Sequence, residues 1–241
     1  MNDDTSYLFD HANWEWASPQ SIPHRIIEHL QFTAIGLALA AAIAIPIGLY
    51  IGHTNRGAFI AINIGNAGRS VPTFGLLSLI VTLIGLGQLP LILALVVLAV
   101  PPILTTTYAG LRAVDPAAVD AARGMGMRPL QTLFQAEVPI ALPLILSGLR
   151  SAALQVVATA TVAAYVGLGG LGRLLVDGLS LNQYDRVVAG AVLVAALAIL
   201  IDLAGSLVQR LVVSPGVSGR VAGVGKASTS TTIPEAAGAP A

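Results

Sequence analysis

Long uncharged stretches are the feature that most constrains what this chain can fold into. No Asp, Glu, Lys or Arg occurs in residues 30–52, and none occurs in residues 70–111. A helix over the first stretch rises about 34 Å, which is enough to cross the hydrocarbon core of a bilayer. Charged residues make up only 10% of the chain, whereas soluble domains contain about 25%. The chain is therefore predicted to be an all-α membrane protein.

Five stretches are predicted to be transmembrane helices. The uncharged run of residues 70–111 is too long for one crossing, and the turn residues Gly85, Gly87 and Pro90 divide it in two. The predicted spans cover residues 30–52, 58–85, 90–110, 141–166 and 187–209, within one transmembrane domain at residues 25–210. A polar loop at residues 112–139 separates the third span from the fourth.

The basic residues predict the orientation of the spans. An odd number of crossings places the two ends of the chain on opposite sides of the membrane. With the N-terminus outside, seven Lys and Arg residues lie inside and three lie outside, which is the bias that the positive-inside rule favours. The twelve basic residues are balanced by twelve acidic ones, so the net charge gives no reason to expect nucleic-acid binding.

The terminal segments differ from the transmembrane domain in composition. Residues 1–24 are acidic and aromatic, with Trp14 and Trp16, and lack the basic start and apolar run of a signal peptide. They are expected to form an interfacial segment outside the membrane. Residues 211–241 are rich in Gly, Ser, Thr, Pro and Ala, a composition that favours a disordered tail in the cytoplasm.

The polar loop carries signals for two short helices. Asp115 followed by Pro116 is an N-cap before a first-turn proline, so a helix is predicted to begin at Pro116. Gly124 and Gly126 are placed to end it. A second short helix is predicted to begin at Arg128–Pro129 and to end before Pro139. Read from these residues alone, a plain loop with two frayed turns is equally compatible with the signals.

One run in this loop resembles the EAA loop of ABC importer permeases. That pattern is Glu-Ala-Ala, three residues, Gly, nine residues, Ile, one residue and Leu-Pro. The matching positions here are Asp120, Ala121, Ala122, Gly126 and Pro139, with Gly124 inside the motif. The sequence departs from the pattern by having Asp120 for Glu, Ala136 for Ile and Val138 for Leu.

Further motifs resemble one branch of these permeases, the importers of glycine betaine, choline, carnitine or proline betaine. They lie at residues 107–111, 114–116, 122–127, 141–150 and 166–172, so the resemblance covers about residues 25–210. Residues 69–72 also resemble methionine-importer permeases. A permease for methionine or another small metabolite therefore stays open as an alternative.

The resemblance implies a five-helix type I importer permease in the bacterial cytoplasmic membrane. Its implied partners are a cytoplasmic ABC ATPase dimer, a second permease subunit and a solute-binding protein outside. The second permease subunit is either a copy of this chain or a paralogue. The EAA loop would dock on the ATPase, which binds the ATP. No cofactor or metal is expected on this chain, and the chain is not expected to be an enzyme.

Two ionisable residues lie inside predicted spans, where an isolated charge is costly. Arg150 and Asp202 each lie eight residues from the cytoplasmic end of their span, about 12 Å deep. They are predicted to pair, although a proton or ion relay of an ion-coupled secondary transporter is the alternative. Arg69, followed by Ser70 and Pro72, is predicted to mark a helix break, either beside the transport pathway or near cytoplasmic water.

Three remaining features give no reason to expect a specific ligand site on this chain. The four histidines, His11, His24, His29 and His53, lie at or outside the predicted membrane edges and are expected to be solvated. The glycine-rich residues 167–172 match GxGxxG without a βαβ context, so a flexible outer turn is expected rather than a nucleotide site. Aromatic rings are few in the spans, which favours a low-affinity passage with specificity in the binding protein.

Overall fold

The fold was analysed in a computed structural model, which describes residues 6–16, 18–59, 61, 63, 64, 70 and 72–213. Every regular element in these residues is a helix. They are α1 (Ser6–Phe9), η1 (His11–Trp14), α2 (Ile22–Thr54), α4 (Thr73–Ile84), α5 (Gln88–Arg112), α6 (Pro116–Gly124), α7 (Pro129–Thr132), η2 (Leu133–Glu137), α8 (Val138–Ala160), η3 (Thr161–Val166), α9 (Gly172–Ser180) and α10 (Tyr184–Val212).

Four helical segments are long and apolar enough to cross a membrane. They are α2 with 33 residues, α5 with 25, the continuous helical run Pro129–Val166 with 38, and α10 with 29. These segments contain the predicted first, third, fourth and fifth spans. The first begins earlier than predicted, because Ser21 is the N-cap of α2 and Pro23 lies in its first turn.

In the second predicted span, residues 58–85, the described residues contain no helix as long as those of the other four spans. Its longest described helix is α4, with 12 residues, which rises about 18 Å and is shorter than a bilayer crossing. The helix begins directly after Pro72, whose backbone is extended, and ends at Gly85, whose φ is +92°. Proline cannot continue a helix from the preceding residues without loss of a hydrogen bond, so α4 starts there.

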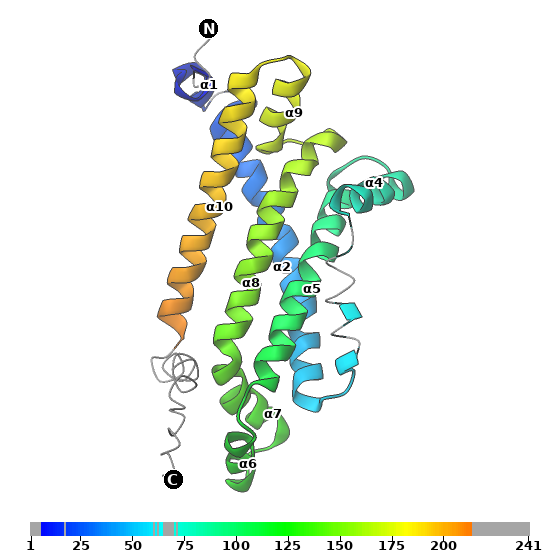
Figure 1. The fold of residues 1–241 in the computed structure, drawn as a ribbon, viewed down its shortest axis with the longest axis vertical. Coiled ribbons are helices and arrows are strands. Elements are labelled where there is room, and N and C mark those ends of the chain that lie inside the picture. Colours follow the sequence, from blue (N-terminus) through cyan, green and yellow to red (C-terminus); the bar gives the residue numbers. More distant parts are fainter. Residues whose placement is uncertain are drawn as a thin grey trace, which may run out of the picture.

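The long helices form a bundle with a short-helix region at one end (Figure 1). α2, α5 and α8 make its centre, α10 packs on α8 and α9, and α4 packs on α5. α6 and α7 lie at the end of the bundle where α5 finishes and α8 begins, while α1 and α9 lie at the opposite end. The bundle therefore has a loop end and an α9 end, and α1 lies at the end opposite to the last turn of α10.

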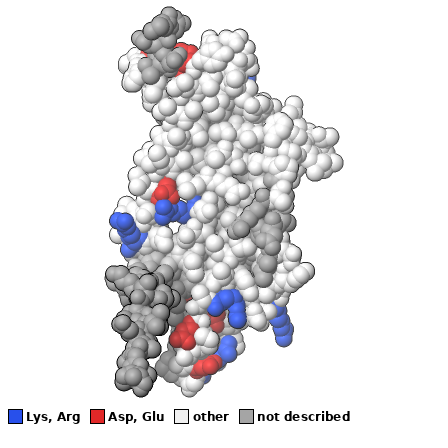
Figure 2. All heavy atoms as spheres, viewed as in Figure 1, with Lys and Arg blue, Asp and Glu red and all other residues white. Residues whose placement is uncertain are grey.

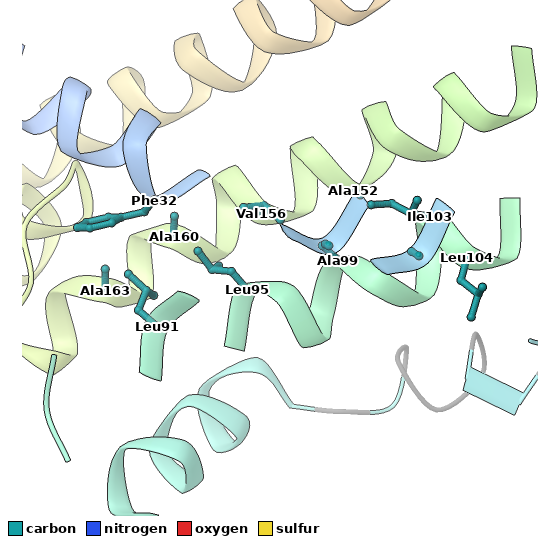
Figure 3. Packing of buried hydrophobic residues seen from close by; sticks show 12 residues of the cluster. Phe32, Leu91, Leu95, Ala99, Ile103, Leu104, Ala152, Val156, Ala160 and Ala163 are labelled. Carbon is teal, nitrogen blue, oxygen red and sulfur yellow. The ribbon is translucent and has the colours of Figure 1, made fainter. Parts of the chain in front are cut away.

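The core between α2, α5 and α8 is built from small and aliphatic side chains (Figure 3). Ala40 and Ala44 of α2, Ala99 of α5 and Ala152 of α8 are fully buried. Larger side chains fill the space around them, including Phe32, Leu91, Leu95, Ile103, Leu104 and Val156. Small residues let helix backbones approach closely, which is the main way that helices associate where there is no hydrophobic driving force.

Glycines mark the closest helix contacts. A Cβ at Gly48 of α2 would lie 2.7 Å from Cβ of Thr107, and one at Gly52 would lie 2.7 Å from Cβ of Leu111. A Cβ at Gly148 of α8 would overlap the side chain of Thr106 on α5. The two interfaces of α5 therefore depend on the missing side chain at these positions.

Replacing Gly148 by alanine is expected to destabilise the bundle by about 1–3 kcal/mol, the usual cost of overpacking a core. The measurement is the melting temperature of the purified protein in detergent. The matched control is Gly124→Ala in α6, where an added Cβ meets nothing within 4 Å, and it should melt like the wild type. A Gly148→Ala protein that melts with the control would contradict the close-packing interpretation.

Candidate functional site

The loop between α5 and α8 begins with the predicted helix. The side chain of Asp115 accepts a hydrogen bond of 2.9 Å from the backbone N–H of Ala117, as an N-cap does. α6 then runs from Pro116 to Gly124, and Gly126 follows with φ of +85°. This positive φ favours glycine, and it turns the chain away from the helix axis. The prediction of a capped helix ended by the glycine pair is confirmed.

The second part of the loop differs from the prediction. α7 begins at Pro129, with the backbone N–H of Arg128 donating to Oε1 of Gln131 at 2.9 Å. The helix does not end before Pro139, because a π-helical turn at Leu133–Glu137 continues directly into α8. Pro139 lacks an N–H and would crowd the carbonyl four residues earlier. The wider π turn just before it accommodates both effects, and the loop is joined rigidly to α8.

The loop presents a largely exposed surface at one end of the bundle. Asp120, Ala121, Gly124 and Gly126 are exposed, whereas Ala122 is buried. Three large apolar side chains of the loop are also exposed: Met125, Leu130 and Phe134. Charged side chains gather around this end, and most of the rest of the visible face is uncharged apart from a mixed group at mid-height on its left side (Figure 2). Exposed apolar side chains in a charged, water-facing region are typical of a protein interaction surface.

A buried histidine–carboxylate contact lies beneath this loop. Nδ1 of His53, in the last turn of α2, is 2.7 Å from Oε2 of Glu137, the last residue of the π turn. The His53 side chain is 14% exposed and that of Glu137 is 6% exposed. Both residues line a cavity of about 200 Å³ that is also bordered by Asp120 and Arg123 of α6.

Two of the four histidines are not solvated as predicted. His53 pairs with Glu137, and His29 is fully buried in α2, where Nε2 lies 3.0 Å from the backbone oxygen of Val157. The expectation failed because it used position along the sequence alone. The sequence did carry one indication of the contact between His53 and Glu137. His53 directly follows the first predicted span and Glu137 precedes the fourth, so both residues were predicted to lie at the cytoplasmic edge.

Arg150 and Asp202 lie together on neighbouring helices. Nη2 of Arg150 on α8 donates to Oδ2 of Asp202 on α10 at 2.8 Å, and Nε donates to Oδ1. This fork geometry is the strongest form of an Arg–carboxylate contact. The two side chains are 35% and 31% exposed. A second polar contact between the same helices joins Nε2 of Gln209 to the backbone oxygen of Pro143 at 3.2 Å.

The glycine-rich residues 167–172 pack tightly against the start of α2, so the prediction of a flexible turn is wrong. The backbone N–H of Gly170 donates to Oε2 of Glu28 at 2.8 Å, and Glu28 also pairs with Arg25 at 3.0 Å. A Cβ at Gly169 would overlap the Glu28 carboxylate, and one at Gly172 would overlap the backbone oxygen of Thr161. Gly169 and Gly172 are needed for close approach, whereas Gly167 and Gly170 have φ of +78° and +82°, which favours glycine.

The predicted helix break near Pro72 lies only partly within the described residues. Arg69 lies outside them. Ser70 is described as helical, and Pro72 is the extended residue that precedes α4. The structure therefore brings together Arg150 with Asp202, and it groups Asp120, Ala121, Ala122, Gly124 and Gly126 on α6 and the turn after it, with Pro139 at the start of α8.

Comparisons with known proteins identify the class to which this bundle and loop belong. Residues 44–214 match the family described as the binding-protein-dependent transport system inner membrane component. The fold resembles the inward-facing MetNI methionine ABC transporter, with a TM-score of 0.70 and 24% identity over 80% of this chain and 96% of that chain. An amino acid ABC transporter crystallised with histidines has a TM-score of 0.60 and 19% identity, over 78% and 90% of the two chains.

Several curated relatives are more similar in sequence. The glycine betaine/carnitine/choline transport system permease protein OpuCB of Bacillus subtilis is 33% identical over 80% of this chain and 88% of its own. The carnitine transport permease protein OpuCB of Listeria monocytogenes is 36% identical over 76% and 85%. The osmoprotectant import permease protein OsmY of Salmonella typhimurium is 34% identical over 72% and 75%.

The chain therefore belongs to the inner membrane permease subunits of binding-protein-dependent ABC importers. Within that family it belongs to the branch that contains the glycine betaine, choline and carnitine permeases, as the sequence motifs predicted. The ATPase of such a system is a separate subunit. The permease chain itself carries no cofactor.

Replacing Arg150 by leucine is expected to lower the yield of folded protein, because it leaves the Asp202 carboxylate without its partner between two apolar helices. The double variant R150L/D202L removes both charges and should recover part of the loss. The measurement is the monodisperse fraction after detergent extraction. Equal losses in the single and double variants would contradict a stabilising role for the pair.

Proposed function

We propose that this permease imports quaternary ammonium osmoprotectants of the glycine betaine, choline, carnitine and proline betaine class. The observation that carries the proposal is the 33–36% identity to OpuCB permeases of two bacteria over more than three quarters of each chain. The branch motifs in the sequence, such as residues 141–150 and 166–172, support the same class.

The proposed topology has five crossings, with the N-terminal segment outside and the end of α10 in the cytoplasm. The loop end of the bundle, with α6 and α7, is the cytoplasmic end. α2 ends near the loop and α4 lies toward the other end (Figure 1). The second crossing is proposed at residues 58–85, as predicted from the sequence, with α4 in its last part. Residues 211–241 are proposed to be a cytoplasmic tail, and Arg69 is proposed to lie beside the pathway at the break before α4.

The loop is proposed to dock on the ATPase subunit. Four of its motif residues, Asp120, Ala121, Gly124 and Gly126, are exposed, so a partner surface has access to the α6 backbone. Met125, Leu130 and Phe134 offer apolar contact area around it. The further proposed partners are a second permease subunit, an outside solute-binding protein and the lipid that covers the apolar flanks of the bundle.

Transport is proposed to follow from closure of the ATPase dimer on ATP. Closure pulls the loops of the two permease subunits together, and each loop continues through the π turn into α8 without a flexible joint. A displacement of the loop therefore moves α8, and α10 follows because Arg150 and Gln209 hold the two helices together. The bundle then switches from inward-facing to outward-facing and receives solute from the binding protein.

Solute selection is proposed to lie mainly in the binding protein. A tight site for a quaternary ammonium group surrounds it with several aromatic faces. Among the described spans, the structure records one contact between two aromatic rings that could contribute to such a site. It is an edge-to-face pair of Phe74 on α4 and Tyr165 on η3, whose centroids lie 5.5 Å apart. Both rings are more than half exposed, so they provide a weak contact at most.

Methionine is the second candidate substrate class. The likeness of the fold to the MetNI transporter, with a TM-score of 0.70, is the observation that favours it. The sequence identity to that chain is 24%, which is lower than the identity to the OpuCB permeases. The osmoprotectant class is therefore preferred.

Replacing Ala121 by glutamate is expected to weaken ATPase association by about tenfold or more, because it places a charge in the docking contact. Since Ala121 is exposed, the permease should still fold. The measurement is the amount of ATPase that copurifies with the tagged permease. The control is Ala12→Glu, an exposed alanine at the opposite end of the bundle. Normal ATPase recovery with Ala121→Glu would refute docking at this surface.

Replacing Phe74 and Tyr165 by leucine is expected to raise the KM for glycine betaine or choline by less than about threefold, the value of one exposed cation–π contact. The assay is uptake into ATP-loaded proteoliposomes that contain permease and ATPase, with the binding protein added outside. Methionine, tested under the same conditions with the wild type, distinguishes the two substrate classes. A rise above tenfold in the double variant would place recognition in the permease instead.

A further inference from the structure

The position of the His53–Glu137 pair is unusual among the contacts of the loop. The chain connects the loop covalently to α5 at one end and to α8 at the other, but α2 ends 58 residues before the loop begins. Within the described residues, His53 and Glu137 provide the polar contact between α2 and the loop that the structure records. α2 is also the helix that packs most extensively on α5, so its position affects the whole core.

The surroundings make this contact stiff. The carboxylate of Glu137 is nearly inaccessible to water, and such a group is costly to leave without a partner. His53 lies one residue before the end of α2, and the next residue after the helix, Asn55, caps it in a left-handed conformation. Glu137 is held in the π turn directly before α8. Neither side chain is on a flexible segment.

An open pocket of about 200 Å³ lies beside the pair. Its walls come from α6, through Asp120 and Arg123, and from the ends of α2 and α5, through Gly52, Leu111 and Arg112. The packing of α6 against the bundle is therefore incomplete at this point. The contact between His53 and Glu137, rather than close packing of α6, attaches the loop to α2 here.

We propose that His53 and Glu137 are positioning residues that make α2 move together with α8 when the docking loop is displaced. The proposal rests on the proposed function, because it takes the ATPase as the source of the displacement. Without the pair, loop motion would reach α2 only through side-chain packing in the core. The bundle would then respond incompletely, and ATP would be hydrolysed without full opening of the pathway.

The first test compares ATP hydrolysed per solute imported in proteoliposomes that contain permease and ATPase, with binding protein outside. The double variant H53L/E137L leaves no unpaired buried carboxylate, so it should fold and copurify with the ATPase. We expect its ATP-to-solute ratio to rise about threefold or more, within the usual range for residues that couple distant sites. His53→Asn keeps a donor near the Nδ1 position and should keep the wild-type ratio.

The matched control is Ser180→Ala, which removes a hydrogen bond to the backbone oxygen of Val176 within α9, at the opposite end of the bundle. It should leave the ratio unchanged. If H53L/E137L lowers ATPase activity and uptake together, so that the ATP-to-solute ratio stays at the wild-type value, the proposal is overturned. His53 and Glu137 would then have a purely structural role. If the wild type shows no ATP-driven uptake, the proposed function fails and this inference fails with it, which is a different result from an unchanged ratio.

A second test reads the movement directly. The chain has no cysteine, so spin labels can be attached at Arg56→Cys beyond α2 and Gln135→Cys in the π turn, both of which are exposed. In the complex with ATPase, the label separation should stay the same with and without ATP when His53 and Glu137 are present. In the H53L/E137L background it should change on ATP addition. A separation that changes equally in both backgrounds would overturn the proposal.

Discussion

Close packing of α5 against α2 and α8 is the interaction on which the other elements depend. Glycines at positions 48, 52 and 148 let the three backbones approach to a distance that no side chain permits. In a bilayer, apolar side chains gain little from leaving lipid for protein, so contact area at short range and interhelical hydrogen bonds must hold the helices together. α4, α9 and α10 pack around this centre, and α6 with α7 closes one end of it.

Polar contacts add specificity at three levels of the bundle. At the α9 end, Glu28 holds the glycine-rich turn on the start of α2. Between the two ends, Arg150 and Asp202 join α8 to α10. At the loop end, His53 and Glu137 join α2 to the start of α8. Each contact links elements that are distant in sequence, so each helps to determine which faces of the apolar helices pack together. Apolar packing alone would leave this pairing of faces poorly determined.

These contacts suit a subunit that must move without losing its structure. The π turn at Leu133–Glu137 makes the loop continuous with α8, and the contacts of His53 with Glu137 and of Arg150 with Asp202 extend this continuity to α2 and α10. In the proposed mechanism, a force applied at the loop is carried by helices and polar contacts rather than by a hinge. The family to which the chain belongs places its ATPase on a separate subunit, so such a connection is what the permease itself must supply.

The sequence by itself determined the membrane class, four long spans, the capped helix at Pro116 and the family, because uncharged length, capping residues and ordered motifs are local properties of the chain. It did not reveal that Glu28 holds the glycine turn, that His29 is buried, or that His53 meets Glu137. Each of these depends on residues 84 or more positions apart. Only the tertiary structure decides which distant helix faces meet, because many pairings of apolar helices satisfy the same local pattern and the close glycine contacts select one of them.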